Sequence, residues 1–192
     1  MSFSEYLVSV RKLNNIGRWA SDFMHRRASV AEHSFSVAHI SQMLGVIEEN
    51  HGNRVDWSSL YRKALNHDVV EAFTGDILSH VKHRTETMKS MVNNIELLIA
   101  EDMLFSSMEE PYRSRLKDFM FDGKDKTLEG QILRYADNID ALLECLNESR
   151  LGNKIPFEDK YHEILEKLKN SELHSVAYFV KNILPDLEKG TE

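Results

Sequence analysis

Apolar residues recur at intervals of three and four along most of the chain, which is the spacing of amphipathic helices. The clearest stripe follows Ser29-Val30-Ala31-Glu32, a capping box whose side chains satisfy free backbone amides at a helix start. No run of strictly alternating apolar and polar residues, the pattern typical of strands, is found. We therefore expect a helix from residue 29, with one face formed by Val30, His33, Val37, Ile40, Leu44 and Ile47.

The same spacing predicts six further helices, at about residues 56–74, 84–105, 111–119, 127–149, 157–169 and 172–189. Thr74-Gly75 and Leu151-Gly152-Asn153 supply helix stop signals, and the polar stretch 121–126 predicts a loop. With only 8 Gly and 3 Pro, the chain offers few signals for tight turns between strands. A length of 192 residues suits one domain. The sequence thus predicts an all-α, single-domain bundle of about seven or eight helices spanning residues 1–192.

Charge and cysteine content exclude several classes of partner and site. The formal net charge of −7 disfavours binding to nucleic acid or to anionic membranes. No apolar run approaches the roughly 18–20 residues that a membrane span needs, and residues 1–12 do not resemble a signal peptide. Cys145 is the only cysteine, so neither an intrachain disulfide nor a thiolate zinc site can form. These features favour a cytoplasmic location.

Four residues on three predicted helices form a candidate metal site. His67 and Asp68 are followed by Glu71, and on a helix these three side chains share one arc. His33 lies on the apolar stripe. Asp137 has an apolar residue four positions away on each side, so we expect its carboxylate to face the interior, where it needs an arginine or a metal as partner. Two imidazoles and two carboxylates suit a divalent transition ion, and a further carboxylate can handle a proton on its bound water. A packed core histidine and a solvated His-Asp pair are the plain structural alternatives.

At this point the chain resembles a known family. The order His, His-Asp, Asp on an all-helical chain is the signature of the HD-domain metal-dependent phosphohydrolases, and the resemblance is closest to the bacterial HD-domain 5'-deoxynucleotidases, the YfbR-like family. It covers about residues 16–150 and is carried by Gly17-Arg18-Trp19, Ser29-Val30-Ala31-Glu32-His33-Ser34, the segment 66–76 (NHDVVEAFTGD), Val81-Lys82 and Tyr135-Ala136-Asp137. The loop at residues 77–80 departs from the family pattern, which carries prolines there.

The resemblance implies a role for each matched residue. His33, His67, Asp68 and Asp137 would hold one divalent metal, which could be Mn, Co, Fe or Zn, and Asp68 would also serve catalysis. Glu71 would lie beside the attacking water or the phosphate. Arg18 would bind the phosphate, whereas Trp19 and Asp76 would line the sugar pocket. Without the family pattern, a surface charge, a packing residue and a loop residue are equally acceptable interpretations of these last three.

The implied activity is metal-dependent hydrolysis of the phosphomonoester of a nucleoside 5'-monophosphate, with preference for deoxyribonucleotides, by a homodimeric enzyme. Two alternatives stay open. One is another HD reaction, on a deoxynucleoside triphosphate or a phosphodiester, although the extra basic residues or second histidine pair that such enzymes need cannot be placed. The other is a non-catalytic nucleotide and metal sensor, which would have no use for Glu71 and Arg18.

Overall fold

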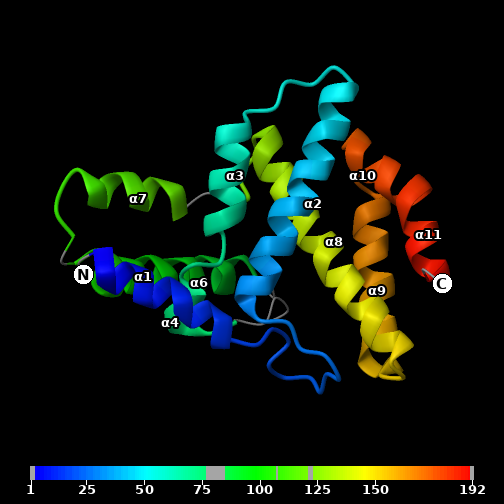
Figure 1. The fold of residues 1–192 in the computed structure, drawn as a ribbon, viewed down its shortest axis with the longest axis horizontal. Helices are drawn as coiled ribbons and strands as arrows, with labels where there is room; N and C mark the ends of the chain where they lie inside the picture. The colour runs from blue at the N-terminus through cyan, green and yellow to red at the C-terminus, as the bar shows by residue number, and fades with distance from the viewer. Residues whose placement is uncertain (1–2, 77–84, 107, 121–122, 191–192) are drawn as a thin grey trace. The chain divides into compact units, whose positions relative to one another are not determined.

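The computed structural model describes residues 3–76, 85–106, 108–120 and 123–190, and within these ranges the chain is helical with no strand (Figure 1). The loop at residues 77–80, which differs from the family pattern, lies outside the described residues, as does Val81-Lys82. The predicted all-α class is confirmed. The helical elements in chain order are α1 (Phe3–Lys12), η1 (Leu13–Asn15), α2 (Val30–Asn50), α3 (Trp57–Asn66), α4 (Glu71–Thr74), α6 (Glu86–Ile99), η2 (Ala100–Phe105), α7 (Tyr112–Met120), α8 (Leu128–Arg150), α9 (Lys154–Lys169), α10 (His174–Tyr178), η3 (Phe179–Ile183) and α11 (Leu184–Lys189). No described helix is long and apolar enough to cross a membrane.

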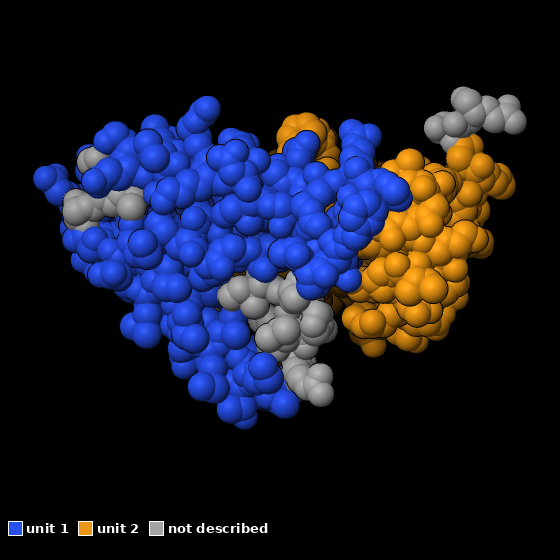
Figure 2. Space-filling model, turned by 90° about the horizontal axis from the view of Figure 1, so that it is seen from below, with its two compact units in different colours: residues 1–34, 65–121 blue, residues 35–64, 122–192 orange. Residues whose placement is uncertain are grey.

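The chain forms two compact units, and each draws on two separate stretches of sequence (Figure 2). Unit 1 comprises Met1–Ser34 and Leu65–Phe121, and unit 2 comprises Phe35–Ala64 and Asp122–Glu192. The long helix α2 therefore contributes its first residues to unit 1 and the remainder to unit 2. That residues 1–192 act as one domain stays a prediction.

Unit 1 is built around one hydrophobic cluster. Tyr6 and Val10 of α1 pack against this cluster, and Leu13, just after α1, belongs to it. These residues are spaced four and three apart, which is a helix signal, although we expected no helix there. The cluster also takes in the start of α2, the two residues before α4 and one residue within it. Its buried members are Leu13, Val30, Val69, Val70, Ala72, Ala100, Leu104, Phe105, Met108 and Met120.

The structure corrects the predicted helix at 56–74. Helix α3 ends at Asn66, residues 67–70 form turns, and α4 begins only at Glu71. The connection uses tight three-residue hydrogen bonds, from the Val69 amide to the Asn66 carbonyl (3.3 Å) and from the Glu71 amide to the Asp68 carbonyl (3.0 Å). Such bonds keep nearly the helical direction, which explains why the apolar periodicity continues through the break.

In unit 2, α8 packs along α9, and the buried residues of both helices follow the predicted spacing. The loop before α8 is held by Asp125, whose carboxylate accepts hydrogen bonds from the Thr127 amide (3.0 Å) and the Lys63 ammonium (2.6 Å). The Thr127 hydroxyl in turn caps the Gly130 amide at 3.1 Å. The loop predicted at 121–126 and the helix predicted from 127 are thus confirmed for the described part of these segments.

Helices α2 and α8 end with the same arrangement around a buried glutamate. In each, a glutamate carboxylate accepts a hydrogen bond from the side-chain amide of the asparagine five residues later, Asn53 to Glu48 (2.6 Å) and Asn153 to Glu148 (2.9 Å). A glycine with positive φ, Gly52 or Gly152, precedes the asparagine and lets the chain turn away from the helix. Glu48 also accepts the Ser175 amide at 2.7 Å, and this bond ties α10 to the end of α2.

We expect Glu48 to stabilise the fold in a pH-dependent way. Burial acts to raise its pKa, but the hydrogen bonds from Ser175 and Asn53 outweigh it and hold the pKa below the usual 4.5. A lowered pKa contributes stability that is complete above about pH 4.5 and is lost as the pH falls through the folded-state value. Glu48→Gln should lower the free energy of unfolding by roughly 1–3 kcal/mol at pH 7, because Glu48 is fully buried.

Denaturant titrations of wild type and variant at several pH values measure this difference, which should shrink below pH 4.5. Glu163→Gln is the matched control, since Glu163 is exposed and pairs only at the surface with Lys167 (2.7 Å). Equal losses in the two variants at pH 7 would show that the Glu48 contacts do not stabilise the fold.

Candidate active site

His33 is placed by the capping box at the start of α2. The Ser29 amide donates to the Glu32 carboxylate (2.7 Å), and the Glu32 amide donates to the Ser29 hydroxyl (3.2 Å), as the sequence predicts. Val30, three residues before His33, is fully buried in the unit 1 cluster. With both the helix start and its apolar face fixed, the His33 ring is held in a site where it is only 1% exposed.

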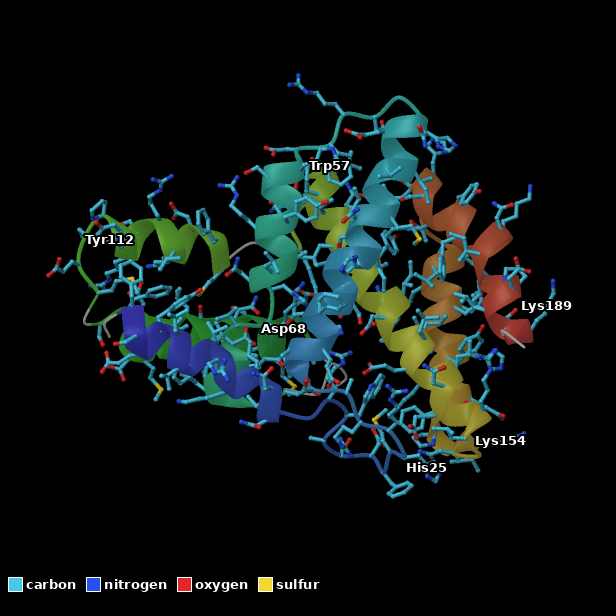
Figure 3. The ribbon with its side chains drawn as sticks, viewed as in Figure 1. His25, Trp57, Asp68, Tyr112, Lys154 and Lys189 are labelled. Carbon is cyan, nitrogen blue, oxygen red and sulfur yellow. The ribbon has the colours of Figure 1, made fainter. Side chains whose placement is uncertain are left out.

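His67 and Asp68 lie in the turn between α3 and α4 (Figure 3). The next two residues, Val69 and Val70, are buried in the cluster, and Glu71 follows directly. The apolar pair therefore fixes the polar residues on either side of it. The predicted helical arc of His67, Asp68 and Glu71 is wrong in detail, because a tight turn rather than an α-helix carries the first two.

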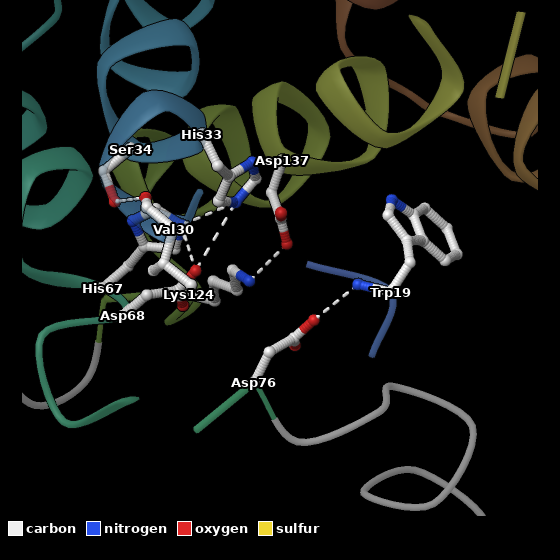
Figure 4. Close-up of polar contacts among 9 residues, drawn as sticks. All are labelled: Trp19, Val30, His33, Ser34, His67, Asp68, Asp76, Lys124 and Asp137. Carbon is white, nitrogen blue, oxygen red and sulfur yellow. Dashed lines mark hydrogen bonds and ion pairs between the residues drawn. The ribbon is translucent and has the colours of Figure 1, made fainter. Parts of the chain in front are cut away.

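Three donor atoms converge in unit 1 (Figure 4). The Nε2 atoms of His33 and His67 lie 3.3 Å apart, and the Asp68 Oδ2 atom lies 3.4 Å from the first and 3.1 Å from the second. Among the described residues, this is the group of three histidine, cysteine or acidic side chains whose ligand atoms all lie within 4.8 Å of one another. Two imidazole nitrogens and a carboxylate oxygen suit a divalent transition ion.

Glu71 supplies a further acidic group whose chemistry fits a bound cation. Its Oε2 atom is buried and has no hydrogen-bond partner among the described residues. Burial raises the pKa of Glu71 to about 9, with further contributions from the negative charges of Asp68 and Asp76, whereas Arg18 and His33 act to lower it. A buried carboxyl group beside two other carboxylates is costly to ionise unless a positive charge joins them.

The contact between Trp19 and Asp76 joins the backbone amide of Trp19 to the side chain of Asp76. The Trp19 amide donates to the Asp76 Oδ2 atom at 2.9 Å (Figure 4). Trp19 has φ of 55°, the one positive value at a non-glycine residue within the described ranges. This backbone conformation costs about 1–2 kcal/mol for an L-residue and needs surrounding contacts to hold it. Asp76 therefore positions Trp19, next to the Arg18 guanidinium that acts on Glu71.

Asp137 belongs to unit 2 and is not among the three grouped donors. Its carboxylate is paired with the Lys124 ammonium at 2.5 Å, and its side chain is 25% exposed. The prediction that this side chain faces the interior is therefore wrong in part, because Ala136 and Asp140 take the buried positions beside it. Its role as a fourth metal ligand stays a prediction.

Sequence reasoning missed Lys124 as the partner of Asp137. We expected a cation beside this carboxylate, but only in the form of an arginine or a metal. The polar loop just before α8 contains a lysine. This was a usable signal for the partner of Asp137, because the loop leads directly into the helix that carries Asp137.

Comparison with known proteins places these residues in a family. The model of the family described as "5'-deoxynucleotidase YfbR-like" matches residues 5–187. A protein of Vibrio atlanticus named 5'-deoxynucleotidase is 26% identical over 189 residues, which cover 98% of this chain and 96% of that protein.

Solved structures agree with the family match. A crystal structure of an HD-domain phosphohydrolase from Listeria innocua is 38% identical, with a TM-score of 0.89 over 97% of this chain and 90% of that chain. The cyanophage S-2L HD phosphohydrolase DatZ, bound to dA and one catalytic Zn²⁺ ion, is 19% identical with a TM-score of 0.65 over 96% of each chain, which shows the shared fold. The chain belongs to the YfbR-like family of HD-domain 5'-deoxynucleotidases.

Proposed function

We propose that this protein hydrolyses the phosphomonoester of deoxyribonucleoside 5'-monophosphates to a nucleoside and inorganic phosphate, with one divalent metal ion as cofactor. The observation that carries the proposal is the convergence of His33, His67 and Asp68 in the same unit as the buried, unpartnered Oε2 atom of Glu71. The 5'-deoxynucleotidase names of the relatives support the choice of substrate.

His33, His67 and Asp68 would hold the metal ion, and Asp137 would complete the ligand set. When bound, such an ion lowers the pKa of a coordinated water and offsets negative charge on phosphate oxygens. The identity of the ion stays open between Mn, Co, Fe and Zn, since all four accept imidazole and carboxylate ligands. Asp68 would also take part in catalysis, as a ligand of that ion whose negative charge acts on the nearby Glu71 carboxyl group.

Glu71 is the group that moves a proton. Burial and the neighbouring carboxylates raise its pKa to about 9, and a cation held by the histidines would lower that pKa. A carboxyl group with a pKa near the working pH can take a proton from the attacking water and return it to the leaving 5'-oxygen.

Arg18, Trp19 and Asp76 would bind the substrate. The Arg18 guanidinium offers paired donors to the phosphate and is close enough to act on the charge of Glu71. The Trp19 indole offers a flat apolar face to the sugar, and Asp76 fixes the backbone of that residue. Preference for the deoxy sugar would arise from crowding of the 2'-hydroxyl at this wall.

We also retain two expectations about the setting of the enzyme. The single buried cysteine suits the reducing cytoplasm, and the family resemblance favours a homodimer. Size-exclusion chromatography with light scattering measures the second directly.

The direct test of the activity is phosphate release from matched deoxy and ribo 5'-monophosphates, with each of the four divalent ions added to metal-free protein. We expect release from the deoxynucleoside monophosphates with at least one ion. A protein that binds nucleotide and metal but releases no phosphate would be a sensor, and release from triphosphates or phosphodiesters alone would indicate another HD reaction.

Loss of one ligand should remove the metal and the activity together. We expect Asp68→Ala to retain little metal after dialysis, because the site then lacks one of its two proposed carboxylate ligands and binds a divalent ion more weakly than the full set. Elemental analysis of the purified protein measures this. Asp102→Ala is the control, since Asp102 is exposed in the same unit. Wild-type metal content in Asp68→Ala would rule out the ligand assignment.

Substitution of Glu71 should separate catalysis from metal binding. Glu71→Gln preserves the shape of the side chain but cannot accept a proton, so we expect the metal content and melting temperature to stay near wild type. Turnover should fall about 10²-fold or more, the range typical of general acid–base groups. Steady-state kinetics on dAMP measure this, and turnover within a few-fold of wild type would exclude the role.

Two substitutions of Asp76 should affect sugar selection differently. Asp76→Asn retains an oxygen that can accept the Trp19 amide, whereas Asp76→Ala removes it and releases the strained backbone. We expect Asp76→Ala to lower the ratio of kcat/KM for dAMP over AMP, and Asp76→Asn to change it less. A selectivity ratio that both variants leave at the wild-type value would show that Trp19 and Asp76 do not select the sugar.

A further inference from the structure

The segment between Gly17 and Ser29 forms a closed loop that carries Arg18 and Trp19. Its neck is an antiparallel bridge, in which the Arg18 amide donates to the Ala28 carbonyl (3.0 Å) and the Val30 amide donates to the Ile16 carbonyl (2.8 Å). Inside the neck, the Asp22 amide donates to the Trp19 carbonyl at 2.9 Å. These bonds close the loop, and several of its carbonyl groups face the Arg27 side chain.

One side chain, Arg27, binds three of these carbonyls at once. Its Nη1 atom donates to the carbonyl oxygens of Arg18 and of Trp19 (2.6 Å for the latter), and its Nη2 atom donates to that of Asp22 (2.5 Å). The planar, forked guanidinium can hold several acceptors in fixed directions, which the single ammonium of lysine cannot do. The bound carbonyls include those of both residues that we assign to the substrate.

Gly17 makes room for this side chain. A Cβ atom at position 17 would lie 2.4 Å from the Arg27 Cδ atom and 3.2 Å from its Cγ atom, so the stem of Arg27 crosses the space that a side chain would fill. Any larger residue at 17 would displace the guanidinium from the loop. Gly17 thus allows the Arg27 side chain to lie close to the backbone of the loop.

We propose that Arg27 is a positioning residue for the nucleotide site. Together with Asp76 it fixes the left-handed backbone of Trp19, Asp76 at the amide and Arg27 at the carbonyl, and so sets the direction of the neighbouring Arg18 side chain. Arg27 itself touches neither metal nor phosphate in this scheme. The inference rests on the proposed function only for the roles of Arg18 and Trp19, because the loop contacts stand independently.

A matched pair of variants tests the proposal against a simple effect of charge. Arg27→Lys keeps the charge but loses the fork, and Arg26→Lys makes the same change at the neighbouring exposed residue. We expect Arg27→Lys to lower kcat/KM for dAMP by roughly 10-fold to 100-fold, the cost of a substrate group misplaced by about an ångström. Arg26→Lys should leave kcat/KM unchanged, and the metal content of both variants should equal that of wild type.

Tryptophan fluorescence gives a readout that does not depend on activity. The chain has two tryptophans, so Trp57→Phe leaves Trp19 as the only one. In that background, Arg27→Lys should lower the fluorescence anisotropy of Trp19 and increase its quenching by iodide, whereas Arg26→Lys should change neither.

A double-mutant cycle with Gly17 completes the test. Gly17→Ala should reproduce the kinetic and fluorescence effects of Arg27→Lys, but should add nothing in an Arg27→Ala background, where the colliding Cδ atom is gone. Additive effects of the two substitutions, or an Arg27→Lys variant whose Trp19 fluorescence equals that of wild type, would overturn the proposal. A wild-type protein that releases no phosphate from any nucleotide would instead overturn the proposed function, and the fluorescence comparison would still decide whether Arg27 holds the loop.

Discussion

The two histidines of the candidate metal site depend on a single hydrophobic cluster. Val30 anchors the first turn of α2, which carries His33, while Val69 and Val70 anchor the turn that carries His67 and Asp68. Burial of each of these side chains contributes roughly 1.5–3 kcal/mol, enough to hold two imidazoles whose Nε2 atoms lie only 3.3 Å apart. The packing therefore brings together two imidazoles that are 34 residues apart in the chain, where they could hold an ion.

Electrostatics explains why such a site needs a cation to bind a phosphate ester. Asp68, Glu71 and Asp76 bring three carboxyl groups together, and the raised pKa of Glu71 records their mutual repulsion as well as its burial. A phosphate dianion would add to this repulsion, which the Arg18 guanidinium opposes with one positive charge. A divalent ion at the histidines would supply the remaining positive charge and would favour the ionised form of Glu71, whose buried Oε2 atom has no hydrogen-bond partner among the described residues.

Much of the fold and of the candidate site could be predicted from sequence, because both depend on local signals. The capping box at Ser29 and the apolar stripe of α2 place His33 correctly, whereas the His67-Asp68 pair is identified as part of a metal site mainly by the family resemblance, and the helical arc expected there is wrong. The break at Asn66 escaped prediction, since a tight turn preserves the helical periodicity that reveals the helix. Tertiary contacts that no local pattern encodes determine three further features. These are the pairing of Asp137 with Lys124, the backbone conformation of Trp19 and the hydrogen bonds of Arg27.

We infer that the histidine–aspartate group of this chain makes it a metal-dependent phosphohydrolase. The most direct test of this inference is phosphate release from dAMP by one preparation that is measured as purified, after removal of metal with a chelator, and after addition of a single divalent ion. We expect removal of the metal to abolish phosphate release and the added ion to restore it, while circular dichroism shows the helices unchanged. Full activity in protein shown by elemental analysis to be free of metal would contradict it.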